Sequence, residues 1–392
     1  MQSLLARLFT IALSLALVPI INAQTEPPLQ GPLLALNTVE RDAILLYDVP
    51  SETTRRLSFG DRMHHVWAFT PDGCRVLFTH ETATGQMRLY SANLDGSAEQ
   101  MLVQYDELPD DAWHIWEPQI SPDGSRIAFT MRREQPQRNG EALLTHHVAW
   151  VDSSGGTPSF YSVTGREHSP QWSPDGRWLV YTSFEERAAG ANVFATAVPT
   201  PESASSTPSI MLNEADLWVV SADGSDKYRL TNFQTGSATE PRWSPDGELV
   251  SFVYSPSNAN DMIWMIANQR EAIPTQLTFQ WSMVLDHSWL PDSAYILSSM
   301  RDFRELAANR LWRVPLVGNA DANVQQYLDG LDLAHADFPR FSADGSLLAV
   351  RTAYELALVD VEAQTVRRFD AVGLDNMPPV WSPAGFAGEA GC

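Results

Sequence analysis

Residues 241–254 have the sequence Pro-Arg-Trp-Ser-Pro-Asp-Gly-Glu-Leu-Val-Ser-Phe-Val-Tyr, which predicts two strands joined by a tight turn. Pro245 fixes the first bend of the turn, Asp246 tolerates the second, and Gly247 adopts a positive φ that other residues resist. An apolar strand ends at Trp243, and another follows the turn from Leu249. This strand–turn–strand unit, which we call the head, sets its own register through its turn and its apolar positions.

The head occurs seven times along the chain. Its copies are 69–73 (Phe-Thr-Pro-Asp-Gly), 120–124 (Ile-Ser-Pro-Asp-Gly), 172–176 and 243–247 (both Trp-Ser-Pro-Asp-Gly), 289–293 (Trp-Leu-Pro-Asp-Ser), 341–345 (Phe-Ser-Ala-Asp-Gly) and a degenerate 381–385 (Trp-Ser-Pro-Ala-Gly). The last positions of successive copies are 51, 52, 71, 46, 52 and 40 residues apart. A unit of about 40–50 residues is typical of the blades of a β-propeller.

A second recurring element, a strand–turn–strand hairpin, lies between the heads. Its copies are 44–57, 87–103, 147–162, 217–230, 263–277, 311–327 and 356–369. Each head with its hairpin supplies four strands. The chain starts with an outgoing strand at 33–37 and ends with a head, so the last head can complete the blade that 33–37 begins. Closing the ring in this way removes free sheet edges. The sequence therefore predicts an all-β fold, a seven-bladed propeller of four-stranded antiparallel blades, with six blades as the alternative.

The composition is acidic and rich in large apolar residues. Hydrophobic residues make up 44% of the chain and 13 residues are Trp, which is ample for a core. The head aromatics suit packing between sheets that are covered on both faces. Charged residues are 19% and the net charge is −22. Because such a surface repels nucleic acid and anionic membranes, we expect no nucleic-acid partner, whereas a cationic partner or a metal stays open.

The N-terminal segment, 1–23, has the features of an export signal. Arg7 precedes an apolar run at 8–21, and Ile21-Asn22-Ala23 is a suitable cleavage site. The apolar run is shorter than the roughly 20 residues of a membrane span, although an uncleaved anchor is the alternative. We expect 24–32 to be a polar lead-in and 33–392 to be one propeller domain. The mature protein is then expected to be a periplasmic or extracellular monomer without a membrane span.

Two segments between the repeats are expected to be loops. Residues 132–144 are charged and predict an exposed loop, and 184–212, rich in Ala, Ser, Thr and Pro, predicts a flexible insertion. The two cysteines, Cys74 and Cys392, each follow a head, and a closed ring would place them in neighbouring blades. An exported protein permits a disulfide between them, and two free thiols are the alternative.

The chain resembles the TolB-type β-propellers, whose repeats carry WD-repeat-like Trp-Ser-Pro-Asp-Gly heads. The resemblance rests on 169–181, on 240–254 and on the hairpin 217–225 (Leu-Trp-Val-Val-Ser-Ala-Asp-Gly-Ser), followed by Arg229-Leu230-Thr231. It covers nearly all of 33–385. It implies a propeller fold, which occurs in periplasmic scaffolds that bind envelope proteins, in propellers attached to peptidases and in a few lyases. We expect two differences from TolB: seven units against six, and no separate α/β domain before the propeller, since strands start almost directly after the expected signal.

Propellers bind ligands at the mouth of the central channel, which places candidate residues just before each head. These candidates are His65, Glu117, His168, Glu240, Asp286, His287 and Asp337. Carboxylates and imidazoles around one channel could hold a divalent metal or a cationic group, and the similar oligogalacturonate lyases carry a metal on channel histidines. The simpler alternative is that these groups are solvated or bonded to neighbouring backbone. The spacing contains no fixed metal-ligand motif, and no Gly-x-Ser-x-Gly motif of a serine hydrolase is present.

Taken together, the sequence favours an exported, non-enzymatic propeller that binds a protein or peptide segment, as TolB-like scaffolds do. The repeat needs no chemistry to explain it. The alternatives are an enzyme, a lyase or hydrolase that uses a channel metal, and a small-ligand binding protein.

Overall fold

The structure, a computed structural model, describes residues 27–60, 63–104, 113–136, 142–161, 164–188, 211–256, 259–278, 282–302, 308–318, 323–352, 355–370, 374–375 and 377–392. The expected export signal at 1–23, the first part of the lead-in, and 189–210 of the expected insertion lie outside these residues. Within the described ranges, no helix has the length and apolar character needed to cross a bilayer.

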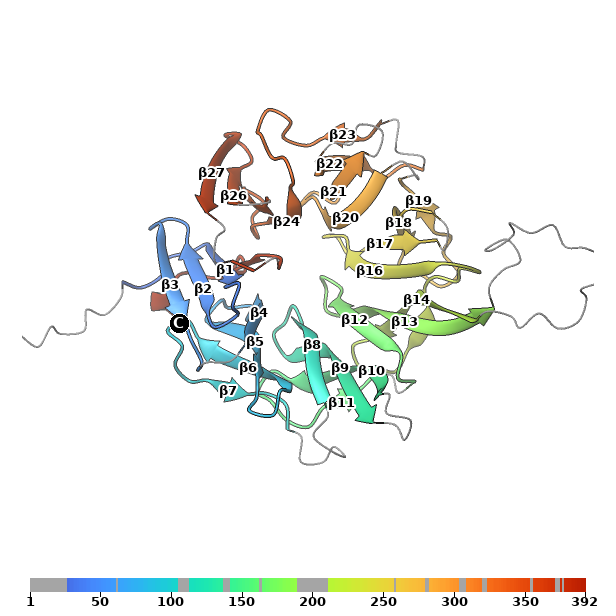
Figure 1. Cartoon of the computed structure of the whole chain (residues 1–392), viewed down its shortest axis with the longest axis horizontal. Coiled ribbons are helices and arrows are strands. Elements are labelled where there is room, and N and C mark those ends of the chain that lie inside the picture. The colour runs from blue at the N-terminus through green and yellow to red at the C-terminus, as the bar shows by residue number, and fades with distance from the viewer. Residues whose placement is uncertain are drawn as a thin grey trace, which may run out of the picture.

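Seven four-stranded antiparallel sheets surround a central opening, so the predicted seven-bladed β-propeller is confirmed and the six-bladed alternative is wrong (Figure 1). We number the blades along the chain, from the innermost strand outward. Blade 1 contains β28 (Val380–Trp381), β1 (Leu33–Asn37), β2 (Ile44–Asp48) and β3 (Thr53–Leu57). Blade 2 contains β4 (His64–Phe69), β5 (Arg75–Glu81), β6 (Met87–Asn93) and β7 (Gln100–Met101).

The remaining blades follow the same order. Blade 3 contains β8 (Trp113–Ile120), β9 (Arg126–Pro136), β10 (Ala142–Asp152) and β11 (Ser159–Phe160); blade 4 contains β12 (Glu167–Trp172), β13 (Trp178–Ala188), β14 (Met211–Ser221) and β15 (Lys227–Arg229). Blade 5 contains β16 (Ser237–Trp243), β17 (Leu249–Ser255), β18 (Met262–Ala267) and β19 (Thr275–Gln276). Blade 6 contains β20 (Ser282–Trp289), β21 (Tyr295–Asp302), β22 (Arg310–Pro315) and β23 (Gln325–Gln326); blade 7 contains β24 (Asp337–Phe341), β25 (Leu347–Arg351), β26 (Glu355–Asp360) and β27 (Thr365–Asp370). A 3₁₀ turn, η2, spans Glu389–Gly391.

The head turns have the geometry that their sequence predicts. In blade 5, Gly247 has φ 75°, and its backbone N–H donates to the carbonyl of Ser244 at 2.9 Å. The hydroxyl of Ser244 donates to the carboxylate of Asp246 at 2.5 Å and accepts the backbone N–H of Leu249 at 2.9 Å. Ser293 takes the place of glycine in the blade 6 turn and also has a positive φ, 58°. The turn therefore imposes this conformation even on a residue with a Cβ atom.

The head tryptophans join neighbouring blades. The indole N–H of Trp243 donates to the carbonyl of Gln171 in blade 4 at 3.0 Å, and three other head tryptophans repeat the contact. Trp172 reaches Gln119, Trp289 reaches Arg242, and Trp381 reaches Arg340. Each ring also fills space between two sheets, and the buried clusters draw residues from adjacent blades. The core therefore lies between blades, which explains why an aromatic residue recurs in the heads.

The ring closes through the two ends of the described chain. Strand β28 pairs with β1, with Leu34 opposite Trp381 and Ala35 opposite Val380, which is the closure that the out-of-phase repeat predicts. The hydroxyl of Ser382 accepts the backbone N–H of Leu33 at 2.9 Å. Further backbone bonds join the two ends: Ser382 N–H donates to the carbonyl of Leu33, Asp375 to that of Asn37 and Glu389 to that of Leu29.

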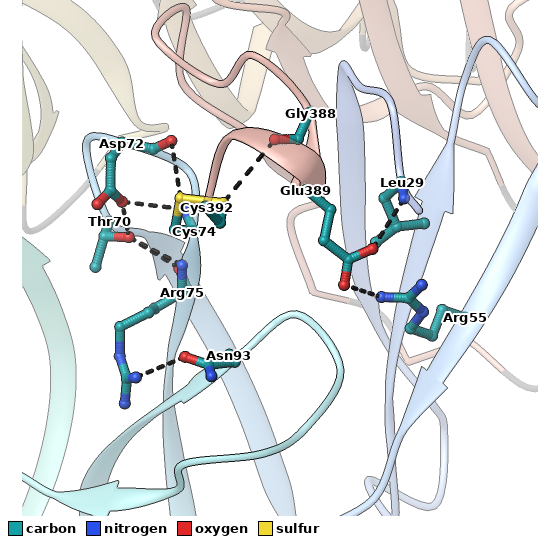
Figure 2. The surroundings of a disulfide bond; sticks show 10 residues. All are labelled: Leu29, Arg55, Thr70, Asp72, Cys74, Arg75, Asn93, Gly388, Glu389 and Cys392. Atoms are coloured by element: carbon teal, nitrogen blue, oxygen red, sulfur yellow. Dashed lines mark hydrogen bonds and ion pairs between the residues drawn. A yellow bond between two sulfur atoms is a disulfide. The ribbon is translucent and has the colours of Figure 1, made fainter. Parts of the chain in front are cut away.

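A disulfide between Cys74 and Cys392 adds a covalent link at the same place, with the Cα atoms 5.4 Å apart (Figure 2). Cys74 lies on the head turn of blade 2, where its backbone N–H donates to the carboxylate of Asp72. Glu389, next to this bond, accepts the backbone N–H of Leu29 at 2.9 Å and pairs with the guanidinium of Arg55 at 2.6 Å. The link connects blade 2 with residues that follow the closing strand.

Two segments expected to be loops are strands at their ends. Strand β9 extends to Pro136 and β10 begins at Ala142, so most of 132–144 forms a β-ribbon that continues the sheet of blade 3. Likewise, β13 extends to Ala188 and β14 begins at Met211, so both ends of the expected insertion at 184–212 are paired strands. The polar composition suggested loops, but paired strands satisfy one another's backbone groups and need no buried apolar face.

Candidate functional site in the central cavity

A cavity of about 1820 Å³ lies at one end of the central channel. The inner strand of every blade contributes to its wall. The contributing side chains include His65 and Trp67 from β4, Trp116 and Glu117 from β8, His168 from β12, Glu240 and Arg242 from β16, Leu285 and Asp286 from β20, Phe338 and Arg340 from β24, and Trp381 from β28. The structure thus brings five of the seven predicted residues to one cavity: His65, Glu117, His168, Glu240 and Asp286.

Bulges in the inner strands direct these side chains. Strands β4, β8, β12, β16, β20 and β24 each shift register by one extra residue. In four of them a non-glycine residue at the bulge has a positive φ: Glu117, Ser169, Glu240 and Phe338. Each of these precedes a proline, which has no N–H to give to the ladder. Bulges and strained backbone of this kind gather at binding sites, where they change the direction of a side chain.

Burial lowers the pKa of all three histidines that line the cavity, His65, His146 and His168, which favours their neutral form. His65 is 4% exposed, and burial lowers the pKa of its imidazole to about 3. His168 stacks on Phe184 with ring centroids 5.0 Å apart, and its Nδ1 lies 2.7 Å from the hydroxyl of Ser169. Burial also lowers the pKa of His168, against the opposing effect of Glu117. Its Nε2 is buried in the wall without a hydrogen-bond partner.

The carboxylate of Glu117 joins blades 3 and 4. Its Oε2 accepts the backbone N–H of Ser169 at 3.0 Å and the hydroxyl of Thr130 at 3.1 Å, and the Ser169 hydroxyl also donates to it. These bonds join the inner strands of two blades, so Glu117 has a structural role at the cavity wall. This agrees with the simpler alternative, in which such residues are bonded to neighbouring backbone.

Asp286 holds two arginines that the sequence analysis did not identify. It is 3% exposed, and it pairs with Arg242 at 3.1 Å through Oδ1 and with Arg340 at 2.7 Å through Oδ2. Burial alone would raise the pKa of Asp286, but the two guanidiniums hold that pKa below its ordinary value. Glu240 lines the same part of the cavity, where loss of solvation raises its pKa and the charge of Asp286 acts in the same direction.

His287 and Asp337 do not belong to the cavity lining. His287 is fully buried, its Nε2 lies 3.1 Å from the hydroxyl of Ser251, and burial lowers its pKa to about 3. Consecutive residues of a strand point to opposite faces, so Asp286 and His287 cannot both face the channel. Asp337 accepts the amide N–H of Asn309 at 2.6 Å and the hydroxyl of Ser299 at 3.1 Å.

The candidate residues do not assemble a metal site in the described part of the chain. No group of three His, Cys, Asp or Glu side chains among the described residues lies close enough to hold a metal ion. Arginines separate the carboxylates, and Arg242 and Arg340 already occupy Asp286. Among the described residues, these donors therefore do not form a site for the divalent metal that the sequence left open.

Sequence analysis also missed the apolar part of the wall. Leu143 and Leu144 lie on the β9–β10 ribbon, which was expected to be a loop, and they are 48% and 43% exposed. Leu285, the extra residue of the β20 bulge, is 39% exposed. A proline within a predicted inner strand was the available signal for four of the other five bulges, as in Glu240-Pro241-Arg242 and Phe338-Pro339-Arg340; the bulge of β4 has no proline.

No family model matches the chain. Among curated proteins, the chain is 24% identical over 234 residues to the "uncharacterized peptidase YuxL" of Bacillus subtilis, an alignment that covers 60% of this chain and 29% of the relative. It is 27% identical over 141 residues to the "uncharacterized protein Atu1656" of Agrobacterium fabrum, covering 35% of this chain and 45% of the relative. The aligned part therefore spans less than half the length of either relative.

Solved structures with this fold come from proteins of different activities. They include an oligogalacturonate lyase from Vibrio parahaemolyticus, with a TM-score of 0.56 at 12% identity over 87% of this chain and 84% of the other. A puromycin-hydrolyzing peptidase of Mycobacterium tuberculosis has a TM-score of 0.58 at 12% identity over 86% of this chain and 53% of the other. TolB from Acinetobacter baumannii has a TM-score of 0.48 at 16% identity, covering 89% of this chain and 81% of the other. The chain is therefore a seven-bladed β-propeller, and its fold is similar to those of the lyase and peptidase structures.

Proposed function

We propose that the protein is an exported, non-enzymatic β-propeller that binds a peptide segment of a partner protein in its central cavity. The size of the cavity carries this proposal. Small-molecule pockets measure about 300–1,000 Å³, whereas this cavity measures about 1820 Å³. A segment of several residues fits that space better than a single small ligand does.

The wall has the mixed character that a peptide requires. Leu143, Leu144 and Leu285 expose apolar surface for side chains of the segment. The guanidinium groups of Arg132 and Arg166 line the same wall and are 35% and 42% exposed, so they offer donors to the backbone carbonyls of a segment.

The ring also keeps the wall in place before a ligand binds. Interblade indole bonds and the closing strand fix the inner strands, so little conformational entropy is lost when a segment enters. The rim is built on the β9–β10 ribbon and on strand bulges, which position side chains more rigidly than loops do.

Selection from a library of random peptides by the purified protein tests the binding proposal. Leu285→Asp places a charge in the apolar part of the wall and should weaken binding of the selected peptides at least tenfold. Ile273→Asp is the matched control, because Ile273 is 87% exposed and is not among the residues that line the cavity. The proposal fails if no peptide is retained, or if both variants lose binding equally.

Export is tested separately. Mass spectrometry of the protein recovered from the periplasm or medium of an expressing bacterium should find the new N-terminus at Gln24. Recovery of only the full-length chain from the cytoplasm would contradict this part of the proposal.

A further inference from the structure

The cavity is far less acidic than the rest of the protein. The chain has 26 Lys and Arg against 48 Asp and Glu. Among the residues that line the cavity, the arginines equal the carboxylates in number: Arg132, Arg166, Arg242 and Arg340 against Glu117, Glu186, Glu240 and Asp286. An anionic group repelled by the outer surface therefore meets a balanced charge inside the cavity.

The positive charges are concentrated beside Asp286. Arg242 from blade 5 and Arg340 from blade 7 both bind this carboxylate, which comes from blade 6 between them. Two guanidiniums share one buried carboxylate, so the three side chains together keep a charge of +1. The side chains of Arg242 and Arg340 are 29% and 20% exposed, so part of each guanidinium faces the cavity. An arginine offers five N–H donors in a planar fork that matches a carboxylate.

Both arginines are held rigidly at the backbone. The carbonyl of Arg242 accepts the indole N–H of Trp289 at 3.1 Å, and that of Arg340 accepts the indole N–H of Trp381 at 2.8 Å. Each arginine follows a bulge and immediately precedes the head aromatic of its blade. Asp286 then fixes the two side chains in the cavity wall, so it acts as a positioning residue.

Apolar side chains flank the pair. Leu285 precedes Asp286 and is 39% exposed, and Phe338 lies two residues before Arg340 at a bulge with positive φ. Both line the same cavity as the arginines. A ligand group that fits this place has a carboxylate next to an apolar side chain.

We propose that Arg242 and Arg340 form a carboxylate subsite, which binds a peptide segment through a free C-terminal or side-chain carboxylate adjacent to an apolar residue. The inference rests on the proposed peptide-binding function and names the ligand chemistry of that site. Glu240 lies in the same part of the cavity and its charge opposes that of the ligand. Neutralising Glu240 should therefore strengthen binding, while neutralising either arginine should weaken it.

The test uses two pools of random acetylated hexapeptides, one with free C-terminal carboxylates and one amidated. The purified full chain is incubated with each pool, and retained peptides are identified by mass spectrometry. We expect the peptides retained from the free-carboxylate pool to end in an apolar residue, or to carry Asp or Glu beside an apolar residue. From the amidated pool we expect only peptides with Asp or Glu beside an apolar residue, which separates the two sources of carboxylate.

Variants then locate the subsite. Arg340→Gln and Arg242→Gln should each weaken binding of a selected peptide by about tenfold to a hundredfold, the range of a charged hydrogen bond. Each leaves Asp286 with one guanidinium, so a thermal melt can show that either variant folds. Arg177→Gln is the control for net charge, since Arg177 is 77% exposed on the blade 4 head turn. Glu240→Gln should tighten binding, and Glu248→Gln, on an exposed turn, should not.

The outcomes separate the two proposals. If retained peptides lack carboxylates but still depend on Leu285, peptide binding stands and the carboxylate subsite is wrong. If both arginine variants fold and bind selected peptides as the parent protein does, the subsite is also wrong. If neither pool gives a retained peptide, both proposals fail.

Discussion

Loss of the Cys74–Cys392 disulfide should destabilise the ring by several kcal/mol. The bond joins residues separated by 318 positions. In the chain-entropy relation, a loop of that length corresponds to roughly 6 kcal/mol at 25 °C, while measured disulfides contribute about 2–4 kcal/mol. The strand pairing that closes the ring is short, with two residue pairs between β28 and β1 and one isolated bridge between Thr38 and Leu374. We therefore expect Cys392→Ser to lower the free energy of unfolding by about 2–5 kcal/mol.

Equilibrium unfolding in guanidinium chloride measures this loss. Tryptophan fluorescence and far-ultraviolet circular dichroism should both be followed, because coincident transitions justify a single unfolding free energy. Cys74→Ser and the double variant should match Cys392→Ser, since each removes the same bond. The oxidised parent protein in dithiothreitol should shift to the same midpoint.

Two results would refute this reasoning. Detection of two free thiols per chain in the denatured, unreduced protein would show that the disulfide does not form. A change of less than about 0.5 kcal/mol in Cys392→Ser, an amount typical of neutral surface substitutions, would show that the strand pairing closes the ring without covalent help.

Four further outcomes follow from the fold. Trp243→Phe should cost about 1 kcal/mol of stability more than Trp264→Phe in the same denaturation assay, because the indole of Trp243 bonds the neighbouring blade and that of Trp264 has no bond partner. Gly73→Ala should lower the free energy of unfolding by roughly 2–4 kcal/mol, because Gly73 has φ 75° and an added Cβ would lie 2.5 Å from Phe386. Gly60→Ala should lower it by only about 1 kcal/mol, because Gly60 has φ 95° but no atom within 4 Å of an added Cβ. The head-turn aspartates, such as Asp246, have a lowered pKa because Ser hydroxyls and backbone N–H groups donate to them. The stabilisation that these bonds give is complete above the ordinary pKa of 3.8 and is lost as the pH falls through the lowered pKa. The urea concentration at the unfolding midpoint should therefore decrease when the pH is lowered below about 4, and it should decrease less steeply in Asp246→Asn. Chelator treatment should leave the melting temperature unchanged, and a fall of several degrees would show a bound metal that the described residues do not account for.

The repeat allowed the fold to be predicted almost completely. Head and hairpin motifs recur at a propeller period, and their out-of-phase ends predicted that the last head would pair with the first strand. The structure places Trp381 opposite Leu34, in that closure. The prediction succeeded because turn residues and alternating apolar positions are local signals, and each was repeated seven times.

The site was only partly predictable, because it depends on bulges. The position before each head correctly predicted that Asp286 and Glu240 line the cavity. It also predicted His287, but successive residues of a strand point to opposite faces, so His287 is buried away from the cavity. The ion pairs of Arg242 and Arg340 join three blades, and no local pattern encodes contacts between residues about 50 positions apart. The apolar rim was missed because a polar β-ribbon has the composition of a loop.

Hydrogen exchange of the protein, with and without a peptide selected from the free-carboxylate pool, tests most directly whether a segment occupies the central cavity. The account predicts slower exchange along the ribbon that carries Leu144 and along the inner strands β16, β20 and β24. Slower exchange confined to the outer strands β3, β7 and β19, or no change at a saturating concentration of peptide, would contradict it.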